Sequence, residues 1–308
     1  MKLRFTGALC VAVMAVVCLS GCLFVPGATA GGNAPTLGGD RPAAVFLPSK
    51  MVSAKRGTSE WERERPLVIL LHGFTSNGDF HTEYFRLAEL VDEKDFVLVV
   101  PDGTQNSLGL RFWNATSNCC DFEAAEVDDV GYVSGLIDEA ISTYNVDPSR
   151  VYLFGHSNGG FMAHSIACEH ADKIAGVVSV ASSTYTTVGA CAPTSPVPLL
   201  HAHGTLDPVI RYDGGVLVAG SYPSAMETAS RWARYNRCSR SEHTAAVANF
   251  LQDGFSDTDR QRWTGCERGA QVELLTLHGG EHRPSLVQPR FSRMALDRIF
   301  EHDKPRKL

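Results

Sequence analysis

The sequence of 308 residues lacks several features that would assign a protein class at once. It contains no long internal repeat and no low-complexity tract, which favours a single globular domain. Its nine cysteines form no paired C-x-x-C modules, so a zinc ribbon and a redox dithiol are both disfavoured. A positive charge balance is absent too, because 28 basic residues face 34 acidic ones for a net charge of −6. This excess of acid argues against non-specific nucleic-acid binding, which needs a basic surface.

The N-terminus lacks acidic residues. Lys2 and Arg4 precede an uncharged apolar run, Ala8 to Leu19, which is too short for a comfortable membrane span and is typical of a secretory signal. Leu19-Ser20-Gly21-Cys22 resembles a bacterial lipobox and predicts removal of residues 1–21 with a lipid on Cys22. The protein would then be an exported lipoprotein anchored to a membrane. Loss of two basic residues from the leader would change the net charge from −6 to −8.

A second cleavage site competes with the lipobox. Ala28-Thr29-Ala30 is an A-x-A site whose use would release a soluble secreted or periplasmic protein. We favour the lipobox because its small residues and Cys22 directly follow the apolar run. Residues 22–40 are expected to form a flexible tether rich in Gly and Pro, and residues 41–308 the folded domain.

Six cysteines remain after either cleavage. An even number of cysteines in an exported chain indicates disulfide bonds, although their spacing leaves the pairing open. These residues are Cys119, Cys120, Cys168, Cys191, Cys238 and Cys266.

Apolar runs alternate with segments of helical spacing along the chain. The runs predict strands at 66–71, 96–100, 151–154, 174–180, 197–201 and 272–277. The helical spacing predicts helices at 127–144, 161–170, 224–237 and 290–301. Such alternation predicts an α/β fold with a mostly parallel sheet covered by helices on both faces. Ligands of such sheets bind at the loops that leave the carboxyl ends of the strands, here after residues 71, 100, 154, 201 and 277.

One of these loops carries a nucleophile motif. Gly155-His156-Ser157-Asn158-Gly159 matches G-x-S-x-G and lies between a predicted strand and a predicted helix. In that context the serine occupies a strained, sharp turn, and the glycines avoid clashes with the flanking strand and helix. We therefore predict an α/β-hydrolase fold with Ser157 as its nucleophile.

A serine hydroxyl needs a base to take its proton, and the base needs an acid to orient it. In this fold the chain order is Ser, then Asp or Glu, then His, with each partner in a loop after a strand. Asp207 in His203-Gly-Thr-Leu-Asp207 and His282 in Gly279-Gly-Glu-His282 satisfy that order. Rival acids are Asp213 and Glu281. The remaining histidines of these loops are expected to be packed or hydrogen-bonded instead, namely His156, His201, His203 and His278.

Two backbone N–H groups are expected to hold the oxyanion. One belongs to Asn158, the residue after the nucleophile. The other is expected from the loop after the first apolar strand, where Gly73 permits a tight turn and Phe74 is the candidate donor.

These residues resemble a known family. Gly155 to Gly160, the His203–Asp207 segment and the Gly279–His282 segment are similar to motifs of the polyhydroxybutyrate-depolymerase and feruloyl-esterase group, which includes the Lpq-type lipoprotein esterases. Further matches are Pro101–Thr104, Phe112-Trp113 with Cys119-Cys120, and Val127–Gly131, so the resemblance covers residues 40–300. Members are α/β-hydrolases that cleave esters through an acyl-enzyme without a metal or organic cofactor. The resemblance implies Ser157, Asp207 and His282 as the triad.

The resemblance also implies finer assignments. Disulfides Cys168–Cys191 and Cys238–Cys266 follow from it, leaving Cys119 and Cys120. Family members often carry Trp directly after the catalytic His, whereas this chain has Arg283, so Arg283 is a candidate substrate contact or a solvent-exposed residue. Trp113 is a second candidate for the substrate cleft because it follows the second apolar strand, with packing on the domain as the alternative. Asp128 and Asp129 are expected to favour a helix N-terminus rather than to bind a metal.

The sequence thus predicts an exported serine esterase acting on carboxylic esters of hydroxycinnamoyl, short-chain acyl or polyhydroxyalkanoate type. No cofactor is expected, and no nucleic-acid partner. Acyltransferase or peptidase chemistry on the same triad is one alternative. A non-catalytic binding lipoprotein is another, and retention of all three triad residues disfavours it.

Overall fold

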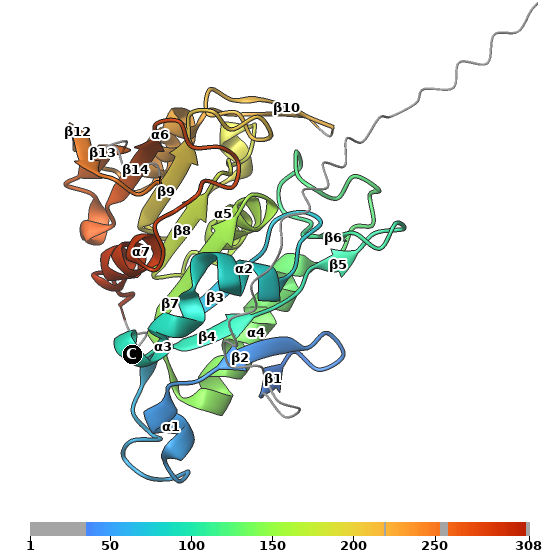
Figure 1. The fold of residues 1–308 in the computed structure, drawn as a ribbon, viewed down its shortest axis with the longest axis vertical. Coiled ribbons are helices and arrows are strands. Elements are labelled where there is room, and N and C mark those ends of the chain that lie inside the picture. Colours follow the sequence, from blue (N-terminus) through green and yellow to red (C-terminus); the bar gives the residue numbers. More distant parts are fainter. Residues whose placement is uncertain (1–34, 219, 253–257, 306–308) are drawn as a thin grey trace, which may run out of the picture. The chain divides into compact units, whose positions relative to one another are not determined.

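A central ten-stranded sheet organises the folded part of the chain (Figure 1). The computed structural model describes residues 35–218, 220–252 and 258–305. The strand order in the sheet is β1-β2-β4-β3-β7-β8-β9-β14-β13-β12. Its bounds are β1 Thr36–Leu37, β2 Ala43–Phe46, β3 Arg65–Leu71, β4 Val97–Val100, β7 Val146–His156, β8 Gly176–Val180, β9 Leu199–Gly204, β12 Arg240–Ala248, β13 Thr258–Thr264 and β14 Val272–Leu277.

The middle of this sheet is parallel and both edges are antiparallel. The six strands from β4 to β14 pair in parallel, whereas β1 and β2 at one edge and β13 and β12 at the other pair antiparallel. Two small hairpins lie outside it, β5 Thr104–Gln105 with β6 Arg111–Phe112, and β10 Gly215–Leu217 with β11 Gly220–Tyr222. The α/β-hydrolase fold and its mostly parallel sheet are therefore confirmed.

Helices cover the sheet on both faces, as Figure 1 shows. The α-helices are α1 Ser49–Ser53, α2 Gly78–Phe85, α3 Val91–Lys94, α4 Asp129–Tyr144, α5 Asn158–Glu169, α6 Ala225–Tyr235 and α7 Arg290–Phe300. Short 3-10 turns lie at Leu87–Leu90, Val188–Ala190 and Glu267–Gly269.

Strand β3 explains why the core has two halves. Its side chains alternate between faces, so that Leu67, Ile69 and Leu71 pack with α4, α5 and α6, while Val68 and Leu70 pack with α2, α3 and α7. A strand that is apolar on both faces appears in the sequence as a continuous hydrophobic run. The run at 66–71 therefore marks the centre of the sheet.

The six strands and four helices expected from the sequence are present, with bounds that differ by a few residues. The largest difference is β7, which begins at Val146 instead of residue 151. Helix α2 and the antiparallel strands at the two edges were not expected.

The tether prediction requires a correction at its end. Thr36–Leu37 forms β1 and pairs with β2, and the Leu37 side chain is buried. The ordered sheet thus begins inside the segment assigned to the tether, because its strand pairing and a buried leucine anchor it. Cys22, both cleavage sites and the tether up to residue 34 lie outside the described residues.

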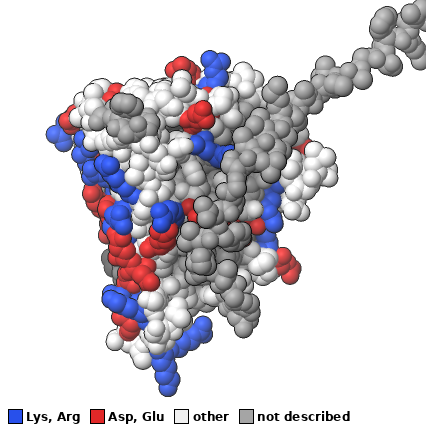
Figure 2. Space-filling model, viewed as in Figure 1, with Lys and Arg blue, Asp and Glu red and all other residues white. Residues whose placement is uncertain are grey.

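Charged residues of both signs gather beside α3 and α7 on the face in Figure 2. Lys94 pairs with Asp297 at 2.5 Å, and Arg293 pairs with Glu93 at 2.8 Å. These exposed pairs link the two helices, and each stabilises the link only modestly because solvent screens the charges.

Candidate active site

Ser157 occupies a sharp turn between β7 and α5. Its backbone has φ 53° and ψ −123°, a left-handed conformation that costs a residue with a side chain on the order of 1–3 kcal/mol. Its N–H donates to the carbonyl of Val180 at 2.9 Å, which ties the turn to β8. The packed strand and helix on either side keep the turn in this conformation. The turn places the Ser157 hydroxyl at the carboxyl end of the sheet.

The glycines of the motif are required by close packing. A Cβ on Gly155 would meet the carbonyl of Gly159, and a Cβ on Gly159 would meet the carbonyl of Leu71 at the end of β3. Both contacts are with backbone, which cannot move aside. The first turn of α5 therefore lies directly against β3 and β7.

His282 and Asp207 meet Ser157 in one chain of hydrogen bonds. The Nε2 of His282 lies 2.9 Å from Ser157 Oγ, and its Nδ1 lies 2.8 Å from Asp207 Oδ2. Since the carboxylate only accepts, Nδ1 carries the proton and Nε2 accepts from the serine hydroxyl. The structure thus brings together all three residues proposed from the sequence, in the tautomer that lets His282 act as a base.

Asp207 is held as a carboxylate by several donors. Its Oδ1 accepts from the N–H groups of Val209 and Ile210 at 2.8 and 2.9 Å. Burial alone would raise the pKa of Asp207, but hydrogen bonds from His203 and His282 outweigh it and lower the pKa well below its ordinary value. A permanent negative charge thus faces the His282 ring.

The rival residues lie elsewhere. Asp213 and Glu281 are exposed, and His278 points its Nε2 at Asp259 Oδ2, 2.9 Å away. Of the buried histidines, His203 contacts Asp207, with Nε2 at 3.3 Å from Oδ2 and at 2.6 Å from the carbonyl of Ile210. His203 therefore supports the acid, a contact that the sequence does not reveal.

The two oxyanion candidates flank Ser157. Asn158 is the first residue of α5, where a backbone N–H has no acceptor within the helix. On the other side, a Cβ on Gly73 would lie 3.3 Å from Ser157 Cβ, so the loop that carries Phe74 passes directly beside the nucleophile. Both predicted donors are thus within the neighbourhood of Ser157.

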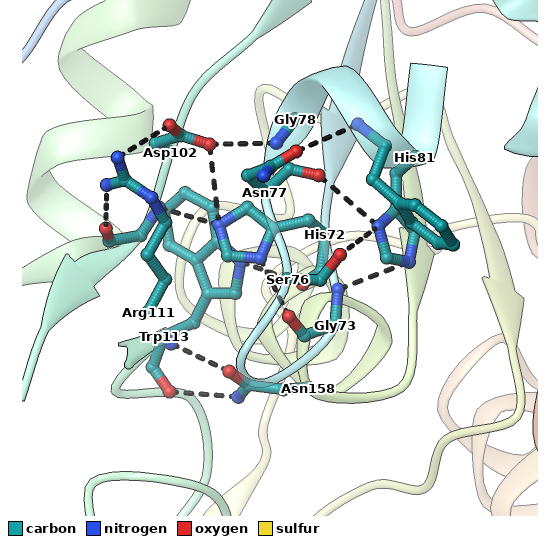
Figure 3. A network of polar contacts seen from close by, with 12 residues as sticks. His72, Gly73, Ser76, Asn77, Gly78, His81, Asp102, Arg111, Trp113 and Asn158 are labelled. Atoms are coloured by element: carbon teal, nitrogen blue, oxygen red, sulfur yellow. Dashed lines mark hydrogen bonds and ion pairs between the residues drawn. The ribbon is translucent and has the colours of Figure 1, made fainter. Parts of the chain in front are cut away.

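The side chain of Asn158 has a separate structural task (Figure 3). Its Oδ1 accepts from the N–H of Trp113 at 2.7 Å, and its Nδ2 donates to the carbonyl of Trp113 at 2.9 Å. The indole N–H of Trp113 donates in turn to the carbonyl of His72 at 3.0 Å. These bonds connect the first turn of α5 to the loop after β3.

Trp113 itself is fully buried. It packs in the core, and Arg41 lies 5.3 Å from its ring centre. Its proposed place in the substrate cleft is therefore corrected: the ring packs on the domain, because its N–H has a carbonyl partner inside. Arg283 is exposed, and its guanidinium lies 5.5 Å from the ring of Phe80 on α2.

Polar bonds also fix the loop that precedes α2. The N–H of Gly78 donates to Asp102 Oδ1 at 2.8 Å, and Arg111 pairs with Asp102 Oδ2 at 3.2 Å (Figure 3). His72 accepts from the N–H of Gly103 at 2.8 Å and donates through Nδ1 to the carbonyl of Gly73, also at 2.8 Å. Burial lowers the pKa of His72 to about 4, so the ring is neutral and holds the loop by hydrogen bonds alone.

The six cysteines form three disulfides. Cys168 pairs with Cys191 and Cys238 with Cys266, with Cα separations of 5.4 and 3.7 Å, as the family resemblance implies. Cys119 and Cys120, left open by the sequence, pair with each other. This last disulfide is buried in an apolar cluster with Phe161 and Ile210.

Asp128 and Asp129 serve the helix and the core. Asp128 caps α4 by accepting from the N–H of Gly131 at 2.7 Å, and buried Asp129 pairs with Arg41 at 2.6 Å. Within the part of the chain that the structure describes, no group of three or more His, Cys, Asp or Glu side chains could hold a metal ion. None of the described helices is both long and apolar enough to span a membrane.

Comparison with known proteins places this arrangement in a family. Residues 58–252 match the family described as Phospholipase/Carboxylesterase. The chain is 28% identical over 240 residues to a putative esterase, NocK, of Nocardia uniformis subsp. tsuyamanensis, covering 74% of this chain and 68% of that protein. It is also 28% identical over 229 residues to feruloyl esterase B of Piromyces equi, covering 72% of this chain but 40% of that longer protein.

Solved structures agree on the fold. The acetyl xylan esterase from Aspergillus awamori superposes with a TM-score of 0.58 at 15% identity, over 87% of this chain and 99% of that one. A thermostable esterase superposes with a TM-score of 0.55 at 15% identity, over 88% of this chain and 63% of that one. At this identity the likeness concerns the backbone arrangement.

Proposed function

The chain belongs to the phospholipase/carboxylesterase family of α/β-hydrolases, and we propose that this carboxylic-ester hydrolase works through an acyl-enzyme on Ser157. The observation that carries the proposal is the chain Ser157–His282–Asp207, with contacts of 2.9 and 2.8 Å on a strained turn. Neither a packing role nor a capping role requires a serine in a left-handed conformation facing an oriented imidazole. No metal or organic cofactor takes part in the proposed reaction.

In the first half of the cycle, Ser157 Oγ attacks the ester carbonyl while His282 Nε2 takes the hydroxyl proton. The negative charge that develops on the carbonyl oxygen is stabilised by the N–H groups of Asn158 and Phe74. Collapse of this intermediate breaks the bond to the alcohol, which leaves with the proton from His282. Asp207 stabilises the imidazolium throughout.

In the second half, His282 removes a proton from water, which attacks the acyl-Ser157 carbonyl. The same two N–H groups hold the second oxyanion. The acid leaves and Ser157 regains its proton. Water as the acceptor separates this cycle from an acyltransferase, for which an added alcohol would yield a new ester.

We propose small or aromatic acyl groups as the preferred substrates, short-chain and hydroxycinnamoyl esters above all. An apolar cluster lies against the site and comprises Phe161, Ile210, Tyr222 and the Cys119–Cys120 disulfide, with Phe74 packed on it. Phe122 contacts Phe74 edge to face at 5.5 Å. An apolar environment of this kind favours an apolar acyl group, and relatives named feruloyl esterase and acetylxylan esterase are similar to this chain in sequence.

The test combines labelling with turnover. A fluorophosphonate probe should label the wild-type protein at Ser157, and Ser157→Ala should abolish both labelling and hydrolysis of p-nitrophenyl acetate. Ser292→Ala is the matched control, since Ser292 is also buried but donates to the Phe85 carbonyl at 2.7 Å, away from the triad. Wild-type turnover by Ser157→Ala would rule out Ser157 as the nucleophile.

We further propose export, with a lipid on Cys22. The signal-like leader and the three disulfides both suit an oxidising compartment outside the cytosol. In a bacterial host, Cys22→Ala should move the protein from the detergent phase to the aqueous phase. If the wild-type protein and the variant both partitioned into the aqueous phase, cleavage after Ala30 would be favoured.

A further inference from the structure

Two buried histidines next to the triad have no part in the proposed cycle. His81 lies on α2 and His156 is the last residue of β7, and both are almost completely buried. His81 Nε2 lies 3.0 Å from His156 Nδ1, and His156 Nε2 lies 2.8 Å from the backbone carbonyl of His282. Ser76 Oγ lies 3.1 Å from His81 Nδ1 at the other end. The contacts run without a break from the oxyanion loop to the base.

The direction of this chain follows from what each atom can do. A carbonyl only accepts, so His156 Nε2 carries a hydrogen and donates to His282. Burial lowers the pKa of His156 well below its ordinary value, so the ring is neutral and its Nδ1 has no hydrogen. His81 Nε2 must therefore donate to His156. The bare Nδ1 of His81 then accepts from the hydroxyl of Ser76.

The opposite assignment fails. The N–H of Gly73 lies 3.4 Å from His81 Nε2, and a hydrogen bond there would need that nitrogen to be bare. His156 would then have to carry hydrogens on both nitrogens and a positive charge inside the core. Burial also lowers the pKa of His81 to about 3, so neither ring is charged near neutral pH. The Gly73 contact and the 3.4 Å contact between His81 Nδ1 and the carbonyl of Asn77 would both need this opposite tautomer, and both are longer than the 3.0 Å contact with His156 and the 3.1 Å contact with Ser76.

Helix α2 holds the base segment at two further positions. The ring of Phe80 lies under the guanidinium of Arg283, and the hydroxyl of Tyr84 donates to the carbonyl of Pro284 at 2.7 Å. Three consecutive residues, 282 to 284, are thus anchored to α2 directly or through His156. The residues just before them are held by the loop after β9 instead, because the N–H of Gly279 donates to Thr205 Oγ1 at 2.9 Å and the carbonyl of buried Gly280 accepts from Leu206 at 2.9 Å. Residues 282 to 284 therefore take their further support from α2.

We infer that Ser76, His81 and His156 form a relay of hydrogen bonds that positions the backbone of His282, and that they are positioning residues of this esterase. The inference rests on the proposed function of Ser157 and His282. The relay also joins the oxyanion loop to the base, because Ser76 lies two residues after Phe74. Disrupting the relay should move Nε2 of His282 relative to Ser157 Oγ. A misplacement of about 1 Å can cost on the order of 100-fold in rate.

Two substitutions at each position separate hydrogen bonding from packing. His81→Leu and His156→Leu introduce an apolar side chain of similar bulk and remove the Nε2–H donor of each histidine. His81→Gln and His156→Gln retain a donor at the place of Nε2. We expect each Leu variant to lower kcat by roughly 10- to 100-fold with KM changed less than about 3-fold, and each Gln variant to recover most of the loss.

His164→Leu is the matched control. His164 is fully buried in α5, its pKa is also lowered by burial to about 3, and its Nε2 contacts Ser179 Oγ at 3.2 Å rather than the triad segment. We expect its kcat to stay within about 3-fold of wild type. Far-ultraviolet circular dichroism and the melting temperature establish that each variant is folded.

Different outcomes test the proposed function and the positioning role of the relay. If fluorophosphonate fails to label wild-type Ser157, the proposed function itself is wrong. If wild-type protein is labelled but folded His81→Leu and His156→Leu keep kcat within about 3-fold, the relay has no positioning role. An equal loss in the Leu and Gln variants, or an equal loss in His164→Leu, would likewise overturn it, because packing alone would then explain the effect.

Discussion

Two pairs of buried histidines lie on either side of Ser157. His81 and His156, on the α2 side, have a hydrogen-bond partner for each ring nitrogen. His164 and His201, between α5 and β9, have a partner only for Nε2, and no described residue pairs with either Nδ1. The residue type and the burial are the same in both pairs, so burial alone does not indicate a histidine's role.

The difference lies in where the last donor points. On the α2 side the chain ends on the backbone of the base. On the α5 side it continues from His201 to His203 at 3.3 Å, and His203 contacts Asp207. His164 is separate from this chain and stacks on Trp232, with ring centres 5.7 Å apart. Both chains of contacts thus reach the triad, one at the backbone of His282 and the other at Asp207, whereas His164 lies apart from them and packs on a core tryptophan.

The largest effect is expected from a substitution of Asp207, which contacts both His282 and His203. Asp207→Asn should lower kcat for p-nitrophenyl acetate by about 10³- to 10⁴-fold, because the amide favours the wrong tautomer of His282. The exposed rival Asp213→Asn provides the control and should stay within about 2-fold. A loss confined to the Asp213 variant would transfer the role of acid to that residue.

A second prediction compares the stability of variants at two buried histidines, His72 and His164. His72→Leu should lower the free energy of unfolding by about 2–5 kcal/mol, because it leaves the Gly103 N–H and the Gly73 carbonyl buried without partners. His164→Leu removes an unpaired buried nitrogen and should change it by less than about 1 kcal/mol. Urea titration at pH 7.5 gives both values. If the two variants were destabilised equally, the hydrogen bonds of His72 would not account for its contribution to stability.

The smallest effect concerns pH. Burial lowers the pKa of His72 to about 4 and of His81 and His164 to about 3, all below the ordinary value of 6.5. Between these values the unfolded chain binds protons that the folded chain does not, so stability falls as pH falls from about 6.5 towards 4. Each such histidine contributes up to about 2 kcal/mol of this loss at pH 5.

His164→Leu should therefore lose less stability than wild type between pH 8 and pH 5, by up to about 2 kcal/mol. Urea midpoints at both pH values measure the difference. Identical losses in the two proteins would show that His164 takes up a proton in the folded state.

Local patterns were enough to predict the centre of the sheet and the nucleophile turn. Strands buried on both faces leave continuous apolar runs, and the G-x-S-x-G turn has its own backbone requirements. The edge strand β12 has mostly exposed residues and no apolar alternation, so it left no pattern to detect. Helix α2 was missed for a similar reason, because only Gly78, His81 and Phe85 are buried along its eight residues.

Single side chains were less predictable than elements. Trp113 was a candidate for the cleft, yet Asn158 and the His72 carbonyl hold it inside the core. The pairing of Cys119 with Cys120 had no counterpart in spacing rules. Both depend on contacts between segments that are about 40 residues apart or on a local turn that spacing does not describe.

The sequence by itself determined the order of strands and helices, the turn that carries Ser157, and the loops that carry Asp207 and His282. It could do so because these features depend on periodicity and on short-range backbone geometry. Only the tertiary structure decided that α2 supports the base segment and that one pair of buried histidines is satisfied while the other is not. Hydrogen bonds such as the one between His81 and His156, 75 residues apart, exist only after the sheet has brought their segments together.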